Sequence, residues 1–165
     1  MGISVVVAER LRSNLSATTT EIPINVTIIE PNMAVKTCFS DADFSALLAR
    51  YAVGDYLRSQ PISAGTVQTN YCLWTTQGKF IFRYYENRTS ESVRFECNLL
   101  AYLKARAYPC PAPIKNQKGE YLGSLRGKPF VLFEFMEGQH LEQPGTLQQK
   151  QLIQKVAELQ NLTRG

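Results

Sequence analysis

The sequence has few of the side chains that build metal centres. It contains one histidine, His140, and four cysteines, none of which lie in a Cys-x-x-Cys pair. Structural zinc sites normally use closely spaced cysteine and histidine ligands, so the composition argues against such a site. The cysteines are instead expected to be reduced and mostly buried, as in a cytoplasmic protein.

The sequence also lacks long apolar runs and clusters of basic residues. No apolar stretch approaches the length of a membrane span, so no membrane partner is expected. The net charge of +4 comes from scattered rather than clustered basic residues, which gives little support to nucleic-acid binding. A mildly basic groove for an anionic small molecule fits the charge at least as well. Neither Gly-x-Gly-x-x-Gly nor the Gly-Lys-Ser/Thr of a Walker A loop occurs.

The segment from Lys79 to Tyr85 is dense in aromatic residues, which favours a β-strand. Successive side chains of a strand alternate between its faces, so Arg83 shares a face with Ile81 and Tyr85. The other face carries Phe80, Phe82 and Tyr84. Arg83 is therefore a guanidinium in the middle of an apolar strand. The aromatic face could stack bases, but a helix packed on it as core is the better interpretation.

The next segment predicts a helix with Glu96 on its apolar stripe, which is formed by Val93, Leu99, Leu100 and Leu103. A carboxylate that faces a core needs a cation, because an unpaired buried charge is very costly. Arg83, on the preceding strand, is the nearest candidate. Kinase-like folds use such a pair to hold a basic group over nucleotide phosphates. A purely structural ion pair, or an arginine at an exposed edge, remains the alternative.

Helical and strand patterns continue on both sides of this segment. Ser40 and Asp43 form a capping-box-like start to a helix that is expected to end near Gly54. Strands are expected over residues 56–62 and 71–75, with turns at Ser63–Gly65 and Gln77–Gly78.

After the Glu96 helix, a proline-rich link leads to an expected second hairpin, with residues 114–116 and 121–124 on either side of Lys118-Gly119. Residues 130–136 are almost continuously apolar, which suits a strand buried on two sides. Residues 147–162 predict a helix whose inner face holds either Leu152, Val156, Leu159 and Leu162, or Ile153 and Val156. The fold class is therefore α+β, a small antiparallel sheet with a packed helix.

Several of these pieces, taken in order, resemble the aminoglycoside phosphotransferase/choline kinase superfamily, and most closely its type II homoserine kinase-like branch. Ile62-Ser-Ala-Gly-Thr-Val-Gln-Thr-Asn-Tyr resembles the first hairpin, with Gly65 and Asn70 at the typical places. Tyr108-Pro-Cys-Pro-Ala-Pro resembles the link, and Gly127-Lys-Pro-Phe-Val-Leu-Phe-Glu-Phe-Met-Glu-Gly resembles the last strand and hinge. The resemblance implies the N-terminal lobe of a protein-kinase-like fold.

The resemblance also implies roles at the phosphate end of a nucleotide site. Arg83 matches the phosphate-binding basic residue, usually lysine, and Glu96 matches its helix partner. Gly65 and Thr66 would cover the phosphates, although a plain hairpin is the alternative interpretation of that turn. The cofactors implied are ATP and Mg²⁺.

At the adenine end, Phe133 would form the back of the pocket. The carbonyl of Glu134 and the amide of Met136 would bond the edge of the base. The domain boundaries expected are a weakly ordered extension over 1–33, a nucleotide-binding lobe over 34–138, and a hinge with the first helix toward a second lobe over 139–165.

The sequence departs from the family pattern where catalysis would be expected. The His-Gly-Asp-x-x-x-x-Asn loop and the metal-binding Asp motif do not appear, and Gln160 stands where the family usually has histidine. We therefore expect the C-terminal catalytic lobe to be absent and the Mg²⁺ ligands to belong to it, so that no catalytic residue is assigned here.

Two functional hypotheses follow. In the first, the chain is the ATP-binding lobe of a small-molecule phosphotransferase with a homoserine-like hydroxyl acceptor, inactive by itself. In the second, it is a non-catalytic half-kinase that binds a nucleotide or a protein. An apolar face near the hinge and the last helix would then be left open to self-association.

Overall fold

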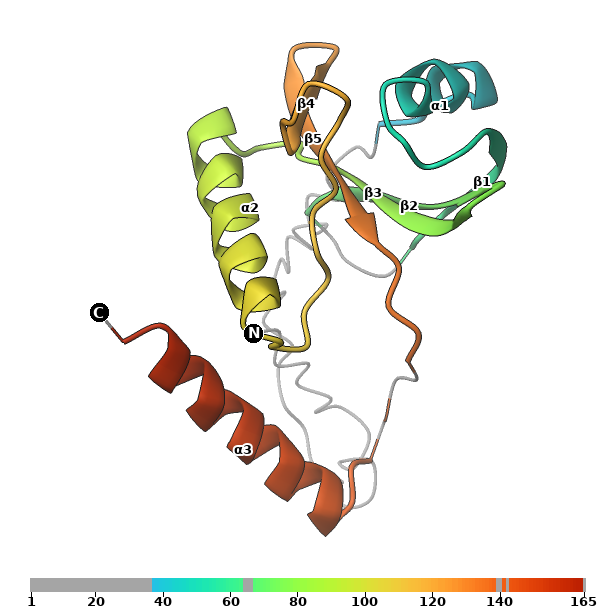
Figure 1. The fold of residues 1–165 in the computed structure, drawn as a ribbon. Coiled ribbons are helices and arrows are strands. Elements are labelled where there is room, and N and C mark those ends of the chain that lie inside the picture. Colours follow the sequence, from blue (N-terminus) through green and yellow to red (C-terminus); the bar gives the residue numbers. More distant parts are fainter. Residues whose placement is uncertain (1–36, 64–66, 139–140, 142, 165) are drawn as a thin grey trace, which may run out of the picture. The chain divides into compact units, whose positions relative to one another are not determined.

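The computed structural model describes residues 37–63, 67–138, 141 and 143–164, and the expected extension over 1–33 lies outside them. Figure 1 shows the elements in their order along the chain. The elements, with their bounds, are α1 (Asp41–Leu48), β1 (Tyr56–Pro61), β2 (Thr69–Thr75), β3 (Gly78–Tyr84), α2 (Ser90–Ala105), β4 (Leu122–Leu125), β5 (Lys128–Glu134) and α3 (Thr146–Leu162).

The strands form one antiparallel sheet in the order β1-β2-β3-β5-β4. The expected strands over 56–62, 71–75 and 79–85 are confirmed as β1, β2 and β3, and the buried apolar strand is confirmed as β5, which ends at Glu134. The expected hairpin around Lys118-Gly119 is wrong. The second hairpin joins β4 to β5 instead, through Arg126 and Gly127, which both have positive φ (50° and 77°) as a tight two-residue turn requires.

Residues 114–116 follow a different path from the one predicted. Ile114 N–H donates to the Leu132 carbonyl (2.8 Å), and Glu134 N–H donates to the Ala112 carbonyl (2.9 Å). The proline-rich link thus runs along the C-terminal half of β5, where β4 does not reach. The Asn116 side chain then accepts from the amides of Lys118 and Glu120, so this segment makes a side-chain-stabilised turn rather than a strand.

Helix α1 begins with the predicted capping box. Asp43 N–H donates to Ser40 Oγ (3.2 Å), and Ser40 N–H donates to Asp43 Oδ2 (2.9 Å). The helix ends at Leu48, earlier than the predicted end near Gly54. Tyr51 is nevertheless buried, because the turn after the helix keeps its ring on the sheet.

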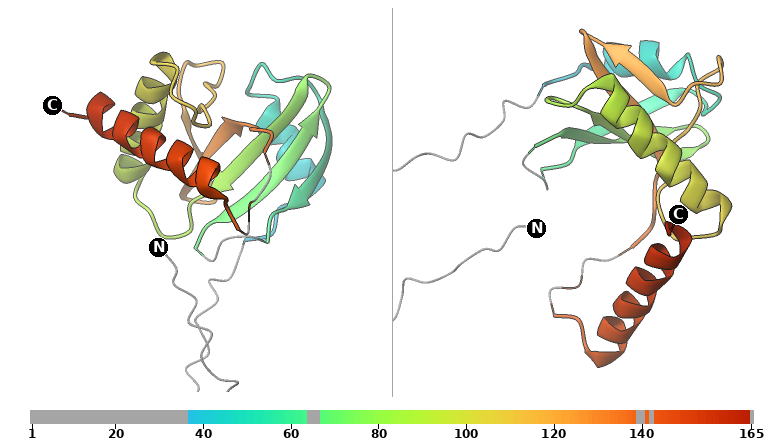
Figure 2. Two further views of the ribbon diagram at one scale, coloured as in Figure 1. Left: turned by 90° about the horizontal axis from the view of Figure 1, so that it is seen from below. Right: turned by 90° about the vertical axis from the view of Figure 1, so that its left-hand side faces the viewer.

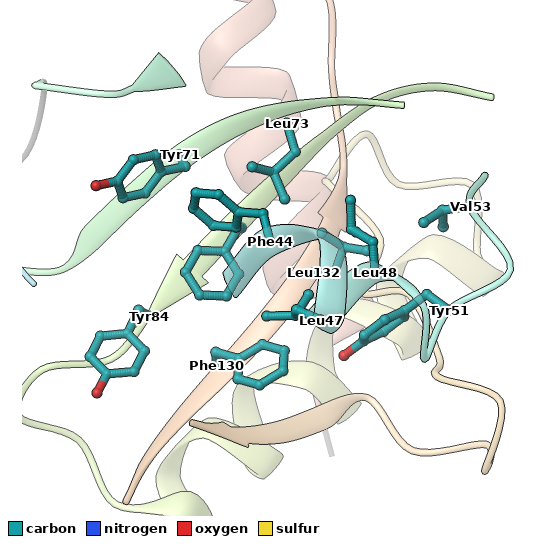
Figure 3. Close-up of a cluster of buried hydrophobic side chains, with 11 residues drawn as sticks. Phe44, Leu47, Leu48, Tyr51, Val53, Tyr71, Leu73, Tyr84, Phe130 and Leu132 are labelled. Carbon is teal, nitrogen blue, oxygen red and sulfur yellow. The ribbon is translucent and has the colours of Figure 1, made fainter. Parts of the chain in front are cut away.

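Two hydrophobic clusters lie on opposite faces of the sheet. The α1 face is covered by Phe44, Leu47 and Leu48 of α1, as Figure 3 shows. They pack on Tyr71, Leu73, Phe82, Tyr84, Phe130 and Leu132 of the strands. The α2 face carries the second cluster, in which Val93 and Cys97 of α2 contact Val131 and Phe133 of β5. The alternation predicted for β3 is therefore confirmed, since Phe82 and Tyr84 lie under α1 and Ile81 lies under α2.

Helix α3 contacts the C-terminal part of α2 and the link that follows it (Figure 2). Tyr102 Oη donates to the Leu162 carbonyl (2.9 Å), and Tyr108 Oη donates to the Lys155 carbonyl (3.1 Å). No residue of α3 is fully buried. Of the predicted inner face, Leu152 and Val156 are exposed, and Leu159 and Leu162 are partly covered within the described part of the chain. The exposed apolar residues of α3 are Leu147, Leu152, Ile153 and Val156.

Three cysteines, Cys72, Cys97 and Cys110, are buried as expected, and Cys38 is exposed. Burial raises the pKa of the Cys97 thiol to about 11, which keeps it protonated and unreactive near neutral pH. Among the helices of the described residues, none has both the length and the apolar character needed to cross a membrane.

Candidate functional site

Arg83 is the second-to-last residue of β3, and its side chain reaches both a neighbouring strand and helix α2. Its cross-strand neighbours are Asn70 on β2 and Val131 on β5. Arg83 Nε donates to Asn70 Oδ1 (3.0 Å), and Nη1 donates to Glu96 Oε1 (3.3 Å). The ion pair predicted between Arg83 and Glu96 is therefore confirmed. Because two elements hold the guanidinium, its position is defined by the sheet and helix together.

Glu96 has two further partners that sequence reasoning did not identify. Its Oε2 accepts from Arg88 Nη1 (2.6 Å), and its Oε1 also accepts from Tyr85 Oη (2.9 Å). Tyr85 was predicted to lie on the same strand face as Arg83, but nothing in the sequence indicated which group its hydroxyl would bond. Arg88 lies in the connection between β3 and α2, where no periodicity indicates direction. Its position one residue before the N-cap Thr89 was the only available clue.

The cluster carries more positive than negative charge, since two guanidinium groups share one carboxylate. The Arg83 and Arg88 side chains are 39% and 43% exposed, whereas that of Glu96 is 20% exposed. Burial and the neighbouring Glu96 carboxylate raise the pKa of Tyr85, so its hydroxyl stays a neutral donor at physiological pH. The arrangement is a half-exposed cationic centre suited to an anion.

Phe133 lies behind this centre. It is 3% exposed within the α2-face cluster, and the Arg83 guanidinium carbon is 5.6 Å from its ring centroid. Its cross-strand neighbour is Ile81, on the same face as Arg83. Phe133 can therefore form a wall of a site, but little of its surface is available to a ligand.

Glu134 and Met136 lie at and just beyond the end of β5. The Glu134 carboxylate pairs with Lys104 Nζ on α2 (2.7 Å), and Met136 is exposed. The next carboxylate, Glu137, pairs with Lys79 Nζ (3.3 Å). These two carboxylates thus meet lysines and do not converge. Across the described ranges, no group of three His, Cys, Asp or Glu side chains could hold a metal ion.

Gly65 and Thr66 lie outside the described residues. Of the two strands that they connect, β2 lies next to β3 and pairs Asn70 with Arg83. Ile62 N–H donates to the Asn70 carbonyl (2.9 Å), and Asn70 in turn holds Arg83. The structure therefore brings Arg83, Glu96 and Phe133 together, and it adds Asn70, Tyr85 and Arg88 to them.

Known proteins of similar sequence and fold indicate the family of the chain. Residues 58–162 match the phosphotransferase enzyme family. The chain is 40% identical over 112 residues to a homoserine kinase of Bartonella henselae, covering 67% of this chain and 35% of that protein. It is 37% identical over 128 residues to a homoserine kinase of Methylobacterium radiotolerans, covering 77% and 40%.

The fold has a solved counterpart. The crystal structure of a spectinomycin phosphotransferase in complex with ADP and spectinomycin aligns with a TM-score of 0.62 at 14% identity, covering 78% of this chain and 40% of that chain. This likeness confirms a protein-kinase-like N-terminal lobe as the fold. The chain spans between a third and two fifths of the length of these relatives. On the family match, the chain belongs to the phosphotransferase enzyme family.

Proposed function

We propose that the chain is the ATP-binding part of a small-molecule phosphotransferase whose acceptor is a homoserine-like hydroxyl compound. The observation that carries the proposal is the Arg83–Glu96 ion pair, which joins β3 to α2 in a member of a phosphotransferase family. Kinase-type folds use a basic residue so placed to bind the nucleotide phosphates. The acceptor follows from the name of the homoserine kinase relatives.

The proposed division assigns the nucleotide-binding lobe to residues 34–138. Residues 139–165 would be the hinge and the first helix toward a second lobe, and residues 1–33 an extension. We place the protein in the cytoplasm, where its buried thiols would stay reduced. We propose neither a nucleic-acid nor a membrane partner. Phe82 and Tyr84, the aromatic side chains that could have stacked on bases, are buried in the core.

At the phosphate end, Arg83 would donate hydrogen bonds to phosphate oxygens while Glu96 and Asn70 hold its guanidinium. A guanidinium has five N–H donors, and two of its nitrogens, Nε and Nη1, serve these partners. The other donors can therefore serve a ligand. Gly65 and Thr66 would close over the phosphates from the β1–β2 connection, which adjoins Asn70.

At the adenine end, Phe133 would be the back wall of the pocket. The Glu134 carbonyl and the Met136 amide would bond the base where β5 ends. Mg²⁺ neutralises phosphate charge in this chemistry. Since the described residues contain no cluster of metal ligands, its protein ligands would come from outside them.

The test is a titration of the purified chain with ATP and Mg²⁺, followed by amide NMR shifts. We expect shifts at residues 67–70, 83 and 134–136, with an affinity no tighter than about millimolar, because half a cleft buries only one side of a ligand. Arg83→Ala should abolish them. Arg106→Ala is the matched control, since Arg106 is an exposed arginine that stacks on Tyr102 at the far end of α2. A folded chain without shifts at millimolar ATP would contradict the proposal.

A second candidate function is a binding module that uses the exposed face of α3. Leu147, Leu152, Ile153 and Val156 are between 46% and 68% exposed. Exposed apolar patches of this kind mark interaction surfaces. Sedimentation velocity tests the candidate. Discrete self-association that is lost in Leu152→Glu/Ile153→Glu, with unchanged helicity, would favour it, and a monomer at all concentrations would exclude a self-associating module.

A further inference from the structure

We propose that Arg88 is a second cation of the phosphate site, and that the site recognises the polyphosphate chain of a nucleoside di- or triphosphate through two guanidinium groups. The inference rests on the proposed function. It deepens that proposal by adding a residue outside the strand-to-helix pair from which the site was predicted.

The first argument is the balance of charge around Glu96. Its Oε2 lies 2.6 Å from Arg88 Nη1, and its Oε1 lies 3.3 Å from Arg83 Nη1. Glu96 therefore makes its closer contact with Arg88, which leaves Arg83 incompletely compensated. A single carboxylate cannot neutralise both cations, so one positive charge remains. An anion placed between the two guanidinium groups would complete the balance.

The second argument is geometric. Glu96 fixes both guanidinium groups on the two oxygens of one carboxylate, which keeps them close together. Tyr85 Oη adds a neutral hydrogen bond to Oε1 and restrains the carboxylate without adding charge. The backbone at Arg88 is also defined, since Thr89 follows it as the N-cap and accepts from Ser92 N–H (3.2 Å). The two cations are thus held in place before any ligand arrives.

The third argument is the availability of donors. Among the described residues, the Arg88 side chain has one hydrogen-bond partner, Glu96 Oε2. Its side chain is 43% exposed, so other N–H groups face solvent. A planar guanidinium fork matches phosphate oxygens, and two forks on one anion favour a chain of phosphates over a single one. The ligand class is therefore a polyphosphate rather than a nucleoside or a carboxylate.

The experiment compares ATP, adenosine and inorganic triphosphate, each without Mg²⁺, as ligands of the full chain in NMR titrations. In Arg88→Gln we expect ATP and triphosphate binding to weaken about tenfold, as loss of a charge-assisted contact predicts, with adenosine unchanged. The dependence of affinity on salt should also become weaker. Arg88→Lys should restore part of the affinity. The matched control is Arg94→Gln, which removes an exposed arginine from α2 outside this cluster.

The outcomes separate the two proposals. Triphosphate binding by Arg88→Gln that equals wild type would overturn the role of Arg88, even if ATP still binds through Arg83. Triphosphate binding that needs Arg88, without shifts at residues 134–136 on addition of ATP, would support the cation pair and contradict the nucleotide site. If neither ligand shifts any resonance of the folded wild-type chain, both proposals are wrong.

Discussion

The two faces of the sheet each hold a buried or half-buried glutamate, and the two glutamates differ in how they are satisfied. Glu86, beside the α1 face, is 5% exposed and accepts from Thr37 N–H, Thr69 Oγ1 and Lys128 Nζ. Glu96, on the α2 face, is shared by two arginines. One carboxylate has a single cation among the described residues, and the other has a cation in excess.

We interpret the difference as that between a structural ion pair at Glu86 and the proposed binding centre at Glu96. Around Glu86 the protein supplies the donors that the carboxylate needs, and the partners draw the chain before α1 onto the sheet. Around Glu96 the charges do not cancel, and both arginines keep exposed surface. A protein gains nothing in stability from uncompensated charge, so the excess points to a ligand.

The largest effect is expected in the aromatic core of the α1 face. Phe82 is fully buried, and its ring lies 5.2–5.4 Å, centroid to centroid, from those of Phe39, Phe44 and Phe130. Phe82→Ala should lower the free energy of unfolding by about 3–5 kcal/mol, because it leaves a cavity in a packed cluster. Urea denaturation measures the change. Phe95→Ala is the control, and since Phe95 is 71% exposed on α2, it should change the stability by less than about 0.5 kcal/mol.

The second-largest effect is expected from acid, which should lower the free energy of unfolding through Glu86, beside the α1 face. Burial alone would raise the pKa of Glu86, but the hydrogen bonds from Lys128, Thr69 and Thr37 outweigh it and lower the pKa to about 2. A carboxylate with a lowered folded pKa stabilises the fold above its unfolded value, here 4.5, and that contribution is lost as the pH falls toward 2. The expected loss is on the order of 3 kcal/mol, since each pKa unit corresponds to about 1.4 kcal/mol.

Urea unfolding at a series of pH values between 6 and about 2 measures this loss. Glu86→Gln is the matched variant, and its stability should vary less over the same range. A wild-type curve that falls no more steeply than that of Glu86→Gln would show that other carboxylates carry the acid sensitivity.

The apolar side chains of the sheet could be placed from the sequence more completely than the polar cluster around Glu96. Strand alternation placed Phe82 and Tyr84 on one face and Arg83 on the other, because side-chain direction in a strand follows from sequence position alone. It also paired Arg83 with Glu96, since a charge on an apolar stripe has few possible partners. Arg88 could not be found in this way, because a loop residue has no periodic direction.

The misplaced hairpin has a similar cause. Lys118-Gly119 reads as a turn, and it is one, but residues 114–116 lie along β5 rather than β4. The actual turn puts Arg126 at positive φ, where asparagine or glycine is usual. The long-range contacts of its side chain, with the Cys38 carbonyl and Asp43, accompany that conformation. A residue held by distant partners carries no local signal.

Two buried tyrosines sharpen the comparison at a smaller scale. Tyr51 Oη, in the α1-face cluster, has no hydrogen-bond partner among the described residues, and burial raises its pKa to about 12. Tyr51→Phe should therefore be neutral or stabilising by up to about 1 kcal/mol. Tyr85→Phe should cost about 1–2 kcal/mol, since it removes a donor to the Glu96 carboxylate. Equal effects in urea denaturation would show that the two hydroxyl groups are equally satisfied.

The smallest change in stability is expected where the change in function is largest. In Arg83→Met, Glu96 keeps Arg88 and Tyr85 as partners, so no carboxylate is left unpaired and the free energy of unfolding should change by less than about 1 kcal/mol. ATP-induced NMR shifts should nevertheless disappear. Lys128→Met is the matched variant on the other face.

Lys128→Met takes from Glu86 its one cation among the described residues, at a side chain that is 5% exposed. Removing one partner of a buried pair typically costs about 3–5 kcal/mol, and because Lys128 itself is 43% exposed we expect the lower end of that range. ATP shifts should survive in this variant wherever it is folded. If Arg83→Met proves as destabilising as Lys128→Met, the Arg83–Glu96 pair is structural. Glu96 keeps Arg88 and Tyr85 as partners in that variant, so a cost of this size would arise only if the fold depended on the pair with Arg83.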